Sequence, residues 1–154
     1  MSVSKINLVI CSVSVFWLAS CALKPITSEY QLVETDIEEV ELDELGDGKV
    51  LIHNGSSFLH MMGGDTRLNV WIDGKALGRL HLKEYAIVNL TKGEYQFEVR
   101  HPDLFGRSFH DVEIDETTKV IEIVPGWTNT LTVTNSLPKK FEKFAYMEKE
   151  RLGW

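Results

Sequence analysis

The sequence predicts an all-β fold, because apolar residues alternate with polar ones and turn residues separate the alternating runs. In the stretch "EYQFEVRH" (94–101), Tyr95, Phe97 and Val99 share one face, and polar side chains share the other. Asp73-Gly74 lies between two strand-like runs, which is the strongest short signal for a β-hairpin. Strands spaced by about ten residues, with no long helix between them, indicate a β-sandwich or a barrel.

The predicted sandwich domain covers residues 49–135, and turns separate its strands. Turn residues occur at Leu90–Glu94, at Asp115–Lys119 and at Pro125-Gly126. The strands that we expect between the turns cover 49–53, 57–61, 67–73, 76–82, 85–90, 94–101, 107–115, 119–124 and 129–135. A domain of roughly a hundred residues buries enough apolar surface to fold alone.

Residues 136–154 are predicted to contain a C-terminal helix of about twelve residues. Ser136 can cap its N-terminus, and Pro138 suits its first turn. Its apolar face would carry Leu137, Phe141, Phe144 and Ala145. We expect this face to pack against the sandwich.

Residues 1–20 have the layout of a secretory signal peptide. Lys5 is their only charged residue, an apolar run from Ile6 to Ser20 follows it, and small residues end the run. Fifteen helical residues span roughly 22 Å, which is less than the roughly 30 Å of a bilayer's hydrocarbon core. The alternative is an uncleaved signal anchor, which would cross the membrane only where the bilayer thins.

The end of this run, Leu18-Ala19-Ser20-Cys21, resembles the lipobox of bacterial lipoproteins. The resemblance implies cleavage between Ser20 and Cys21, a diacylglyceryl group on the Cys21 sulfur and acylation of the new amino group. Two or three acyl chains hold a protein firmly on a membrane, whereas one chain binds marginally. Ala22 stands where an aspartate would favour the inner membrane, so the resemblance implies the outer membrane.

This interpretation leaves no cysteine available for other chemistry. The chain has two cysteines, of which Cys11 lies in the segment to be removed and Cys21 carries the lipid. The mature chain would have no free thiol and no disulfide, although an exported compartment permits disulfides. Cysteine nucleophiles and cysteine-based metal clusters are therefore excluded.

The formal net charge is −7, and nine acidic residues with no basic ones lie between Lys24 and Lys49. We interpret residues 21–48 as a lipid-anchored acidic tether, solvated and self-repelling, that lifts the domain off the membrane. Alternatives are a capped helix from Thr35, a strand at Val40–Leu42, and an acidic patch for calcium or a cationic partner. The acidic excess argues against binding to nucleic acid.

The stretch "VWIDGKALGRLHLKEYAIVNLTKGEYQFEVRH" (70–101) resembles PEGA-type domains and related domain-of-unknown-function lipoproteins of bacterial envelopes. The matching positions are Asp73-Gly74-Lys75, Gly78, Val88, Leu90, Gly93 and Tyr95. Thr91-Lys92-Gly93 departs from the family, which usually has prolines before the glycine. The resemblance implies an immunoglobulin-like antiparallel β-sandwich and a role in display or adhesion of envelope components. It supplies no catalytic residues.

No catalytic or metal-binding motif occurs in the sequence. The five histidines (His53, His60, His81, His101 and His110) form no His-Glu-x-x-His motif and no pair at i,i+4. We find no Gly-x-Ser-x-Gly elbow and no phosphate-binding glycine loop that leads into a helix. We therefore expect no enzymatic activity, no metal and no cofactor.

Two predicted loops carry apolar residues among turn residues. Leu104 and Phe105 lie in one loop and Trp127 in the other. Exposed aromatic residues of this kind anchor partner proteins, so these three are candidate partner-binding residues. The alternative is that they cap the end of the sandwich core.

The sequence thus predicts a lipid-anchored binding or scaffolding module at the periplasmic face of the outer membrane, with an envelope protein as its partner. Anchoring would raise its effective concentration near such a partner. One alternative is a small hydrolase or metal-dependent enzyme that uses histidines gathered by the fold. Another is a domain that adheres to wall polymer or carbohydrate through Trp71, Trp127 or tyrosines on one face.

Overall fold

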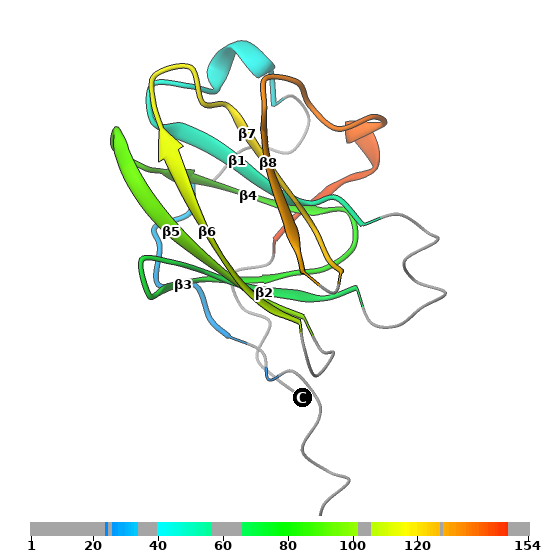
Figure 1. The fold of residues 1–154 in the computed structure, drawn as a ribbon. Coiled ribbons are helices and arrows are strands. Elements are labelled where there is room, and N and C mark those ends of the chain that lie inside the picture. The colour runs from blue at the N-terminus through cyan, green and yellow to red at the C-terminus, as the bar shows by residue number, and fades with distance from the viewer. Residues whose placement is uncertain are drawn as a thin grey trace, which may run out of the picture.

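The computed structural model describes residues 24, 26–33, 40–56, 66–101, 106–126 and 128–147. Its described part is mostly β and forms two sheets (Figure 1). The strands are β1 (Lys49–Asn54), β2 (Leu68–Ile72), β3 (Lys75–Leu80), β4 (Glu84–Asn89), β5 (Gly93–Arg100), β6 (Arg107–Ile114), β7 (Val120–Val124), β8 (Thr130–Thr134) and β9 (Ala145–Tyr146). Eight of the nine predicted strands correspond to β1–β8, and the ninth, 57–61, lies outside the described residues.

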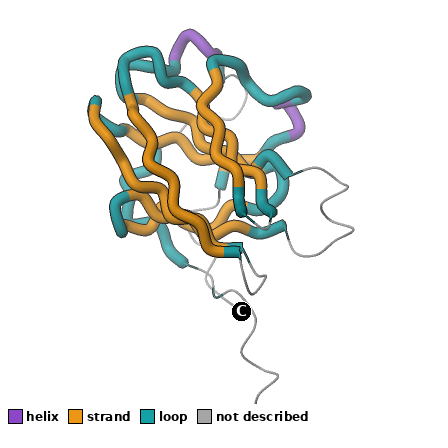
Figure 2. Tube along the Cα trace, in the orientation of Figure 1, coloured by secondary structure: helices purple, strands orange, loops and turns teal. Residues whose placement is uncertain are grey.

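The two sheets pack face to face. One has the order β8-β7-β1-β4-β9 and the other β3-β2-β5-β6. A single cluster of buried residues joins them, with Val50 and Ile121 from the first sheet and Val70, Phe97 and Ile114 from the second. This shared core makes the arrangement sandwich-like, as the paths of the strands in Figure 2 also show.

The five-stranded sheet is mixed rather than purely antiparallel, which corrects the expectation. The central strand β1 pairs antiparallel with β4 but parallel with β7, and β9 is parallel with β4. Parallel pairs need a long crossover connection. Here the chain between β1 and β7 passes through the whole second sheet, so β7 returns to the first sheet in the direction of β1.

The predicted C-terminal helix is wrong for residues 136–147. This segment contains a 3-10 helix (η2, Phe141–Lys143) and the short strand β9. Phe141 packs on Tyr85 with ring centroids 4.9 Å apart, and Phe144 lies edge-on to His53 at 5.6 Å. The two rings also lie 5.7 Å from each other, so they reach β1 and β4 together without a longer helix. The edge of β4 supplies the backbone hydrogen bonds of the segment, through the carbonyls of Lys83 and Tyr85. Residues 148–154 lie outside the described residues.

Lys24 and residues 26–33 lie against the domain and do not form a solvated tether. The Glu29 amide donates to the Ala76 carbonyl at 2.8 Å, and the Val33 amide donates to the Ile87 carbonyl at 2.9 Å. Leu32 is buried, and the Tyr30 hydroxyl donates to the Ile72 carbonyl at 3.0 Å. Figure 1 shows this segment in blue beside β3. The expected tether therefore contributes to the core, because its apolar residues cover the open side between β3 and β4.

Residues 40–48 also belong to the packed unit. They contain a 3-10 helix (η1, Leu42–Glu44) in place of the alternative strand, and Leu45 is buried. The Lys119 ammonium donates to the Leu42 carbonyl at 3.0 Å. The capping box predicted at Thr35 lies outside the described residues. In the part of the chain that the structure describes, no helix is long and apolar enough to cross a membrane.

Candidate functional site at the loop end of the sandwich

Four connections leave the same end of the sandwich, which we call the loop end. They are 55–67, 81–83, 101–106 and 125–129. The strand register requires this grouping, because Asn54 pairs with Ile123 and Leu68 with Leu80 at the ends of their strands. Arg100 pairs with Arg107 at the same end. Loops at one end of a β-sandwich form a shared surface whose residues come from distant parts of the chain.

A buried asparagine joins two of these loops at their base. Asn129 is 1% exposed, and its Nδ2 donates to the Gly106 carbonyl at 3.0 Å and to the Val99 carbonyl at 3.4 Å. Its Oδ1 accepts from the Gly126 amide at 3.2 Å. The chain segments that flank loops 101–106 and 125–129 are thereby held side by side.

The sequence-predicted site residues themselves lie outside the described residues. This holds for the loop residues Leu104, Phe105 and Trp127 and for Ser20 and Cys21 at the predicted cleavage site. What the structure adds is the position of the strand ends from which the two loops leave.

A second buried asparagine holds the two ends of the β1–β2 connection. Asn54 is fully buried, and its Nδ2 donates to the carbonyls of Thr66 at 2.7 Å and Leu80 at 3.2 Å. Its Oδ1 accepts from the Ser56 amide at 3.0 Å and from the Ser56 hydroxyl. One side chain of β1 thus satisfies polar groups of β3 and of both flanks of the loop.

A cluster of arginine and aromatic side chains lies on the outer face of the second sheet, beside the loop end. We call Trp71, Glu98, Arg100, Arg107 and Phe109 the arginine patch. Arg100 and Arg107 are directly opposite each other on β5 and β6, and the Oε1 atom of Glu98 accepts from both, at 2.5 and 2.8 Å. Because like charges directly opposite each other are unfavourable, this shared glutamate is needed to hold the pair.

Each arginine also covers an aromatic ring. The Arg100 guanidinium lies 4.5 Å from the Trp71 ring centre, and that of Arg107 lies 4.8 Å from the Phe109 ring centre. Phe109 is 51% exposed, which is unusual for so large an apolar side chain. Because Arg100 lies over Trp71, this indole does not offer the bare ring that the carbohydrate-adhesion alternative requires.

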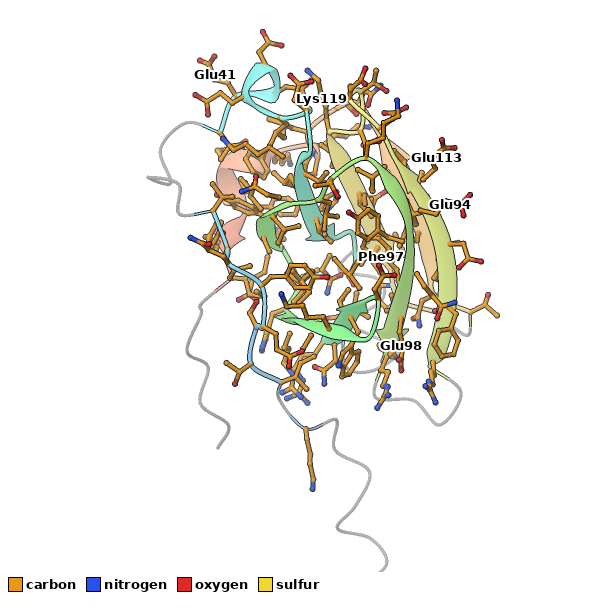
Figure 3. The ribbon with its side chains drawn as sticks, turned by 90° about the vertical axis from the view of Figure 1, so that its left-hand side faces the viewer. Glu41, Glu94, Phe97, Glu98, Glu113 and Lys119 are labelled. Carbon is orange, nitrogen blue, oxygen red and sulfur yellow. The ribbon has the colours of Figure 1, made fainter. Side chains whose placement is uncertain are left out.

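The opposite end of the same sheet is acidic. Glu94 and Glu113 are directly opposite each other on β5 and β6, and both are exposed. Figure 3 shows them far from Glu98, toward the end where Glu41 lies. The outer face therefore has cationic groups near the loop end and carboxylates at the other end.

The described histidines do not assemble a metal site. His53, His81 and His101 lie at or near the loop end, whereas His110 lies on β6 with its Nε2 2.9 Å from the Ser108 hydroxyl. Burial lowers the pKa of His110. Within the described ranges no group of three or more His, Cys, Asp or Glu side chains could hold a metal ion. His60 lies outside those ranges.

His53 is buried in its neutral form. It is 2% exposed, and burial lowers its pKa from 6.5 to about 4, an effect that the Asn54 backbone partly offsets. Its Nδ1 atom has no hydrogen-bond partner among the described residues. A buried, neutral imidazole that contacts Phe144 acts here as part of the packing.

The free energy of unfolding is expected to fall as the pH decreases from 6.5 to 4. In this window His53 takes up a proton in the unfolded chain but not in the folded one, so protons favour unfolding. The full effect is about 3 kcal/mol. Urea unfolding at pH 7 and pH 4 measures it, and in His53→Leu the pH dependence should be much shallower. Equal pH dependence in the two proteins would contradict the assignment.

Comparison with known proteins gives no match among protein-family models, curated proteins or solved structures.

Proposed function

We propose that the protein is a lipid-anchored, non-catalytic binding or scaffolding module of a bacterial cell envelope. Acyl chains on Cys21 would hold it at the periplasmic face of the outer membrane. The observation that carries this proposal is the sequence Leu18-Ala19-Ser20-Cys21 at the end of an apolar run of fifteen residues. The run is short for a bilayer span, which favours a cleaved leader over a spanning anchor.

The neighbour relations of six strands support an immunoglobulin-like class for the sandwich. In that fold strands B and E are neighbours in one sheet, and C, F and G form the other, with C′ added in variable-type domains. Strands β1 to β6 have the same neighbours when they are taken, in chain order, as B, C, C′, E, F and G: β1 lies beside β4, and the other sheet has the order β3-β2-β5-β6. The place of strand A, beside B, is taken by β7, which is parallel to β1. The proposed relation to PEGA-type domains rests on matching positions within this part, which are Asp73-Gly74-Lys75, Gly78, Val88, Leu90, Gly93 and Tyr95.

We propose the loop end as the binding end of the module. Asn129 holds together the flanks of the two loops that contain Leu104, Phe105 and Trp127. The arginine patch lies directly beside them, since Arg100 and Arg107 flank loop 101–106. Aromatic and arginine side chains are the residue types that most often dominate binding energy at interfaces.

Substitution of Cys21 tests the anchor. In Cys21→Ser we expect loss of globomycin-sensitive processing and loss of the acyl mass on the mature N-terminus, because serine offers no sulfur for the lipid. Cys11→Ser is the matched control, since the resemblance places Cys11 in the removed leader. It should be processed and should fractionate with the membrane like the wild type. A wild-type protein whose exported form carries an unmodified Cys21 thiol would overturn the proposal.

A further inference from the structure

The start of the described chain is fixed at the loop end. The Lys24 carbonyl accepts a hydrogen bond from Asn69 Nδ2 at 2.6 Å. Asn69 is 1% exposed, lies near the start of β2, and its Oδ1 accepts from Arg79 Nε at 3.0 Å. From Lys24 the chain continues along the sandwich toward its acidic end, where Glu29 pairs with Ala76. Lys24 therefore lies at the loop end.

This position decides which end of the domain is nearest the membrane, given the proposed lipid on Cys21. Cys21 precedes Lys24 by three residues, which span at most about 11 Å when fully extended. A long acidic tether would have let the domain turn freely above the bilayer. With residues 26–33 packed on the sandwich, the loop end is held close to the headgroups instead.

Among the described residues, the charges at the loop end match an anionic surface. Arg100 and Arg107 have side chains 42% and 57% exposed, whereas the Glu98 side chain between them is 13% exposed. Lys24 and Lys83 are also exposed at this end, and the nearby Glu84 is buried. Arginine pairs readily with phosphate oxygens, and basic residues close to a bilayer are attracted to its anionic lipids. The carboxylates of Glu94 and Glu113 lie at the far end, where repulsion from the surface is weakest.

We propose that the cations beside the loop end, Arg100, Arg107, Lys24 and Lys83, dock on the anionic headgroups of the membrane that holds the anchor, with Arg100 and Arg107 as the main contacts. The inference rests on the proposed lipid anchor. It adds to the proposed function a ligand for the binding end of the module, namely the phosphate group of anionic lipids. The loop end of the module would then lie against the bilayer, and its acidic end would face the periplasm.

The test uses lipidated full-length protein with a single thiol probe in vesicles that contain a headgroup quencher. One probe is Thr128→Cys in the β7–β8 loop, and the other is Glu113→Cys at the acidic end; both positions are exposed. In vesicles of phosphatidylethanolamine and phosphatidylglycerol, quenching at position 128 should exceed that at position 113 by about fivefold or more. Phosphatidylcholine vesicles should reduce the ratio to below about twofold.

Charge reversal separates docking from tethering. Arg107→Glu should lower the ratio to below about twofold in anionic vesicles, because it places a carboxylate against the headgroups. Lys92→Glu is the matched control, since Lys92 is also an exposed cation in an ion pair with a glutamate, Glu116 at 3.4 Å. It should leave the ratio unchanged.

The outcomes distinguish the two proposals. A chain without lipid would fail to enter the vesicles at all, which would count against the anchor. Stable incorporation with equal quenching at both positions would overturn the docking proposal, as would a ratio that Arg107→Glu leaves unchanged. Selective quenching at position 128 that occurs in envelope fragments but not in pure lipid would assign the loop end to a protein partner and would also overturn it.

Discussion

Asn54→Ala is expected to lower the free energy of unfolding by about 4 kcal/mol. The substitution removes the donor for the buried carbonyls of Thr66 and Leu80 and the acceptor for Ser56. Each buried polar group left without a partner costs about 1–3 kcal/mol, and water has no access to Asn54, which is fully buried. Because total stabilities are about 5–15 kcal/mol, this loss is a large fraction of the total.

Urea unfolding followed by tryptophan fluorescence measures this effect. The matched control is Asn89→Ala, which truncates the same side chain at an exposed position of β4 and should change stability by less than about 0.5 kcal/mol. A loss below about 1 kcal/mol in Asn54→Ala would show that the amide does not hold the ends of the β1–β2 connection.

Gly48→Ala is expected to destabilise the protein by about 3 kcal/mol or more. Gly48 has a φ of +89°, and a Cβ there would lie 2.6 Å from the Leu90 carbonyl oxygen. A shift of residue 48 away from Leu90 would break the hydrogen bond that the Leu90 amide donates to the Gly48 carbonyl at 2.8 Å. The turn before β1 and the end of β4 are therefore in backbone contact that only glycine permits.

Gly74→Ala isolates the cause of that destabilisation. Gly74 also has a positive φ, +74°, but a Cβ there meets nothing within 4 Å. It should cost only about 1 kcal/mol, the strain of a left-handed alanine. The difference between the two variants in thermal or urea unfolding is the contribution of the contact with Leu90. Equal costs would mean that backbone strain alone accounts for both.

The strands were predictable because each carries its own local signal. In β5 the alternation is visible in the sequence, since Phe97 and Val99 are buried while their neighbours are not. In β1 five of the six residues are buried, so both faces of this strand are covered, as expected of a central strand. The identity of its partners was not predictable, because β7 reaches β1 only through tertiary packing that leaves no local signal.

The errors occurred where tertiary contacts decide the local structure. Phe141 and Phe144 have a spacing that a helix would place on one face, but the 3-10 helix ends at Lys143 and Phe144 is extended, while the two rings, 5.7 Å apart, contact Tyr85 and His53. Lys140 has a φ of +60°, which ends any helix at that point. In the N-terminal segment, Tyr30 and Leu32 precede a run rich in acidic residues, and their packing on the sandwich depends on tertiary contacts with no local signal.

The candidate site was predictable only in part. Sequence reasoning placed apolar residues in two loops, and it placed Glu98 and Arg100 on the polar face of one strand. It could not bring Arg107, Phe109 and Trp71 beside them, because that requires the register of β5 with both β6 and β2. The one available signal was that Arg100 and Arg107 flank the same short loop.

The parallel pairing of β1 with β7 has a consequence for the order in which the chain folds. Leu51 pairs with Val120, which follows it by 69 residues, so one edge of the central strand has no partner until about three quarters of the 154 residues have been synthesised. Closure of such a long loop slows folding and leaves an unpaired strand open to association with other chains. The chain should therefore depend on assistance against such association until Val124 has been synthesised, and truncation before Val120 should yield no stable product.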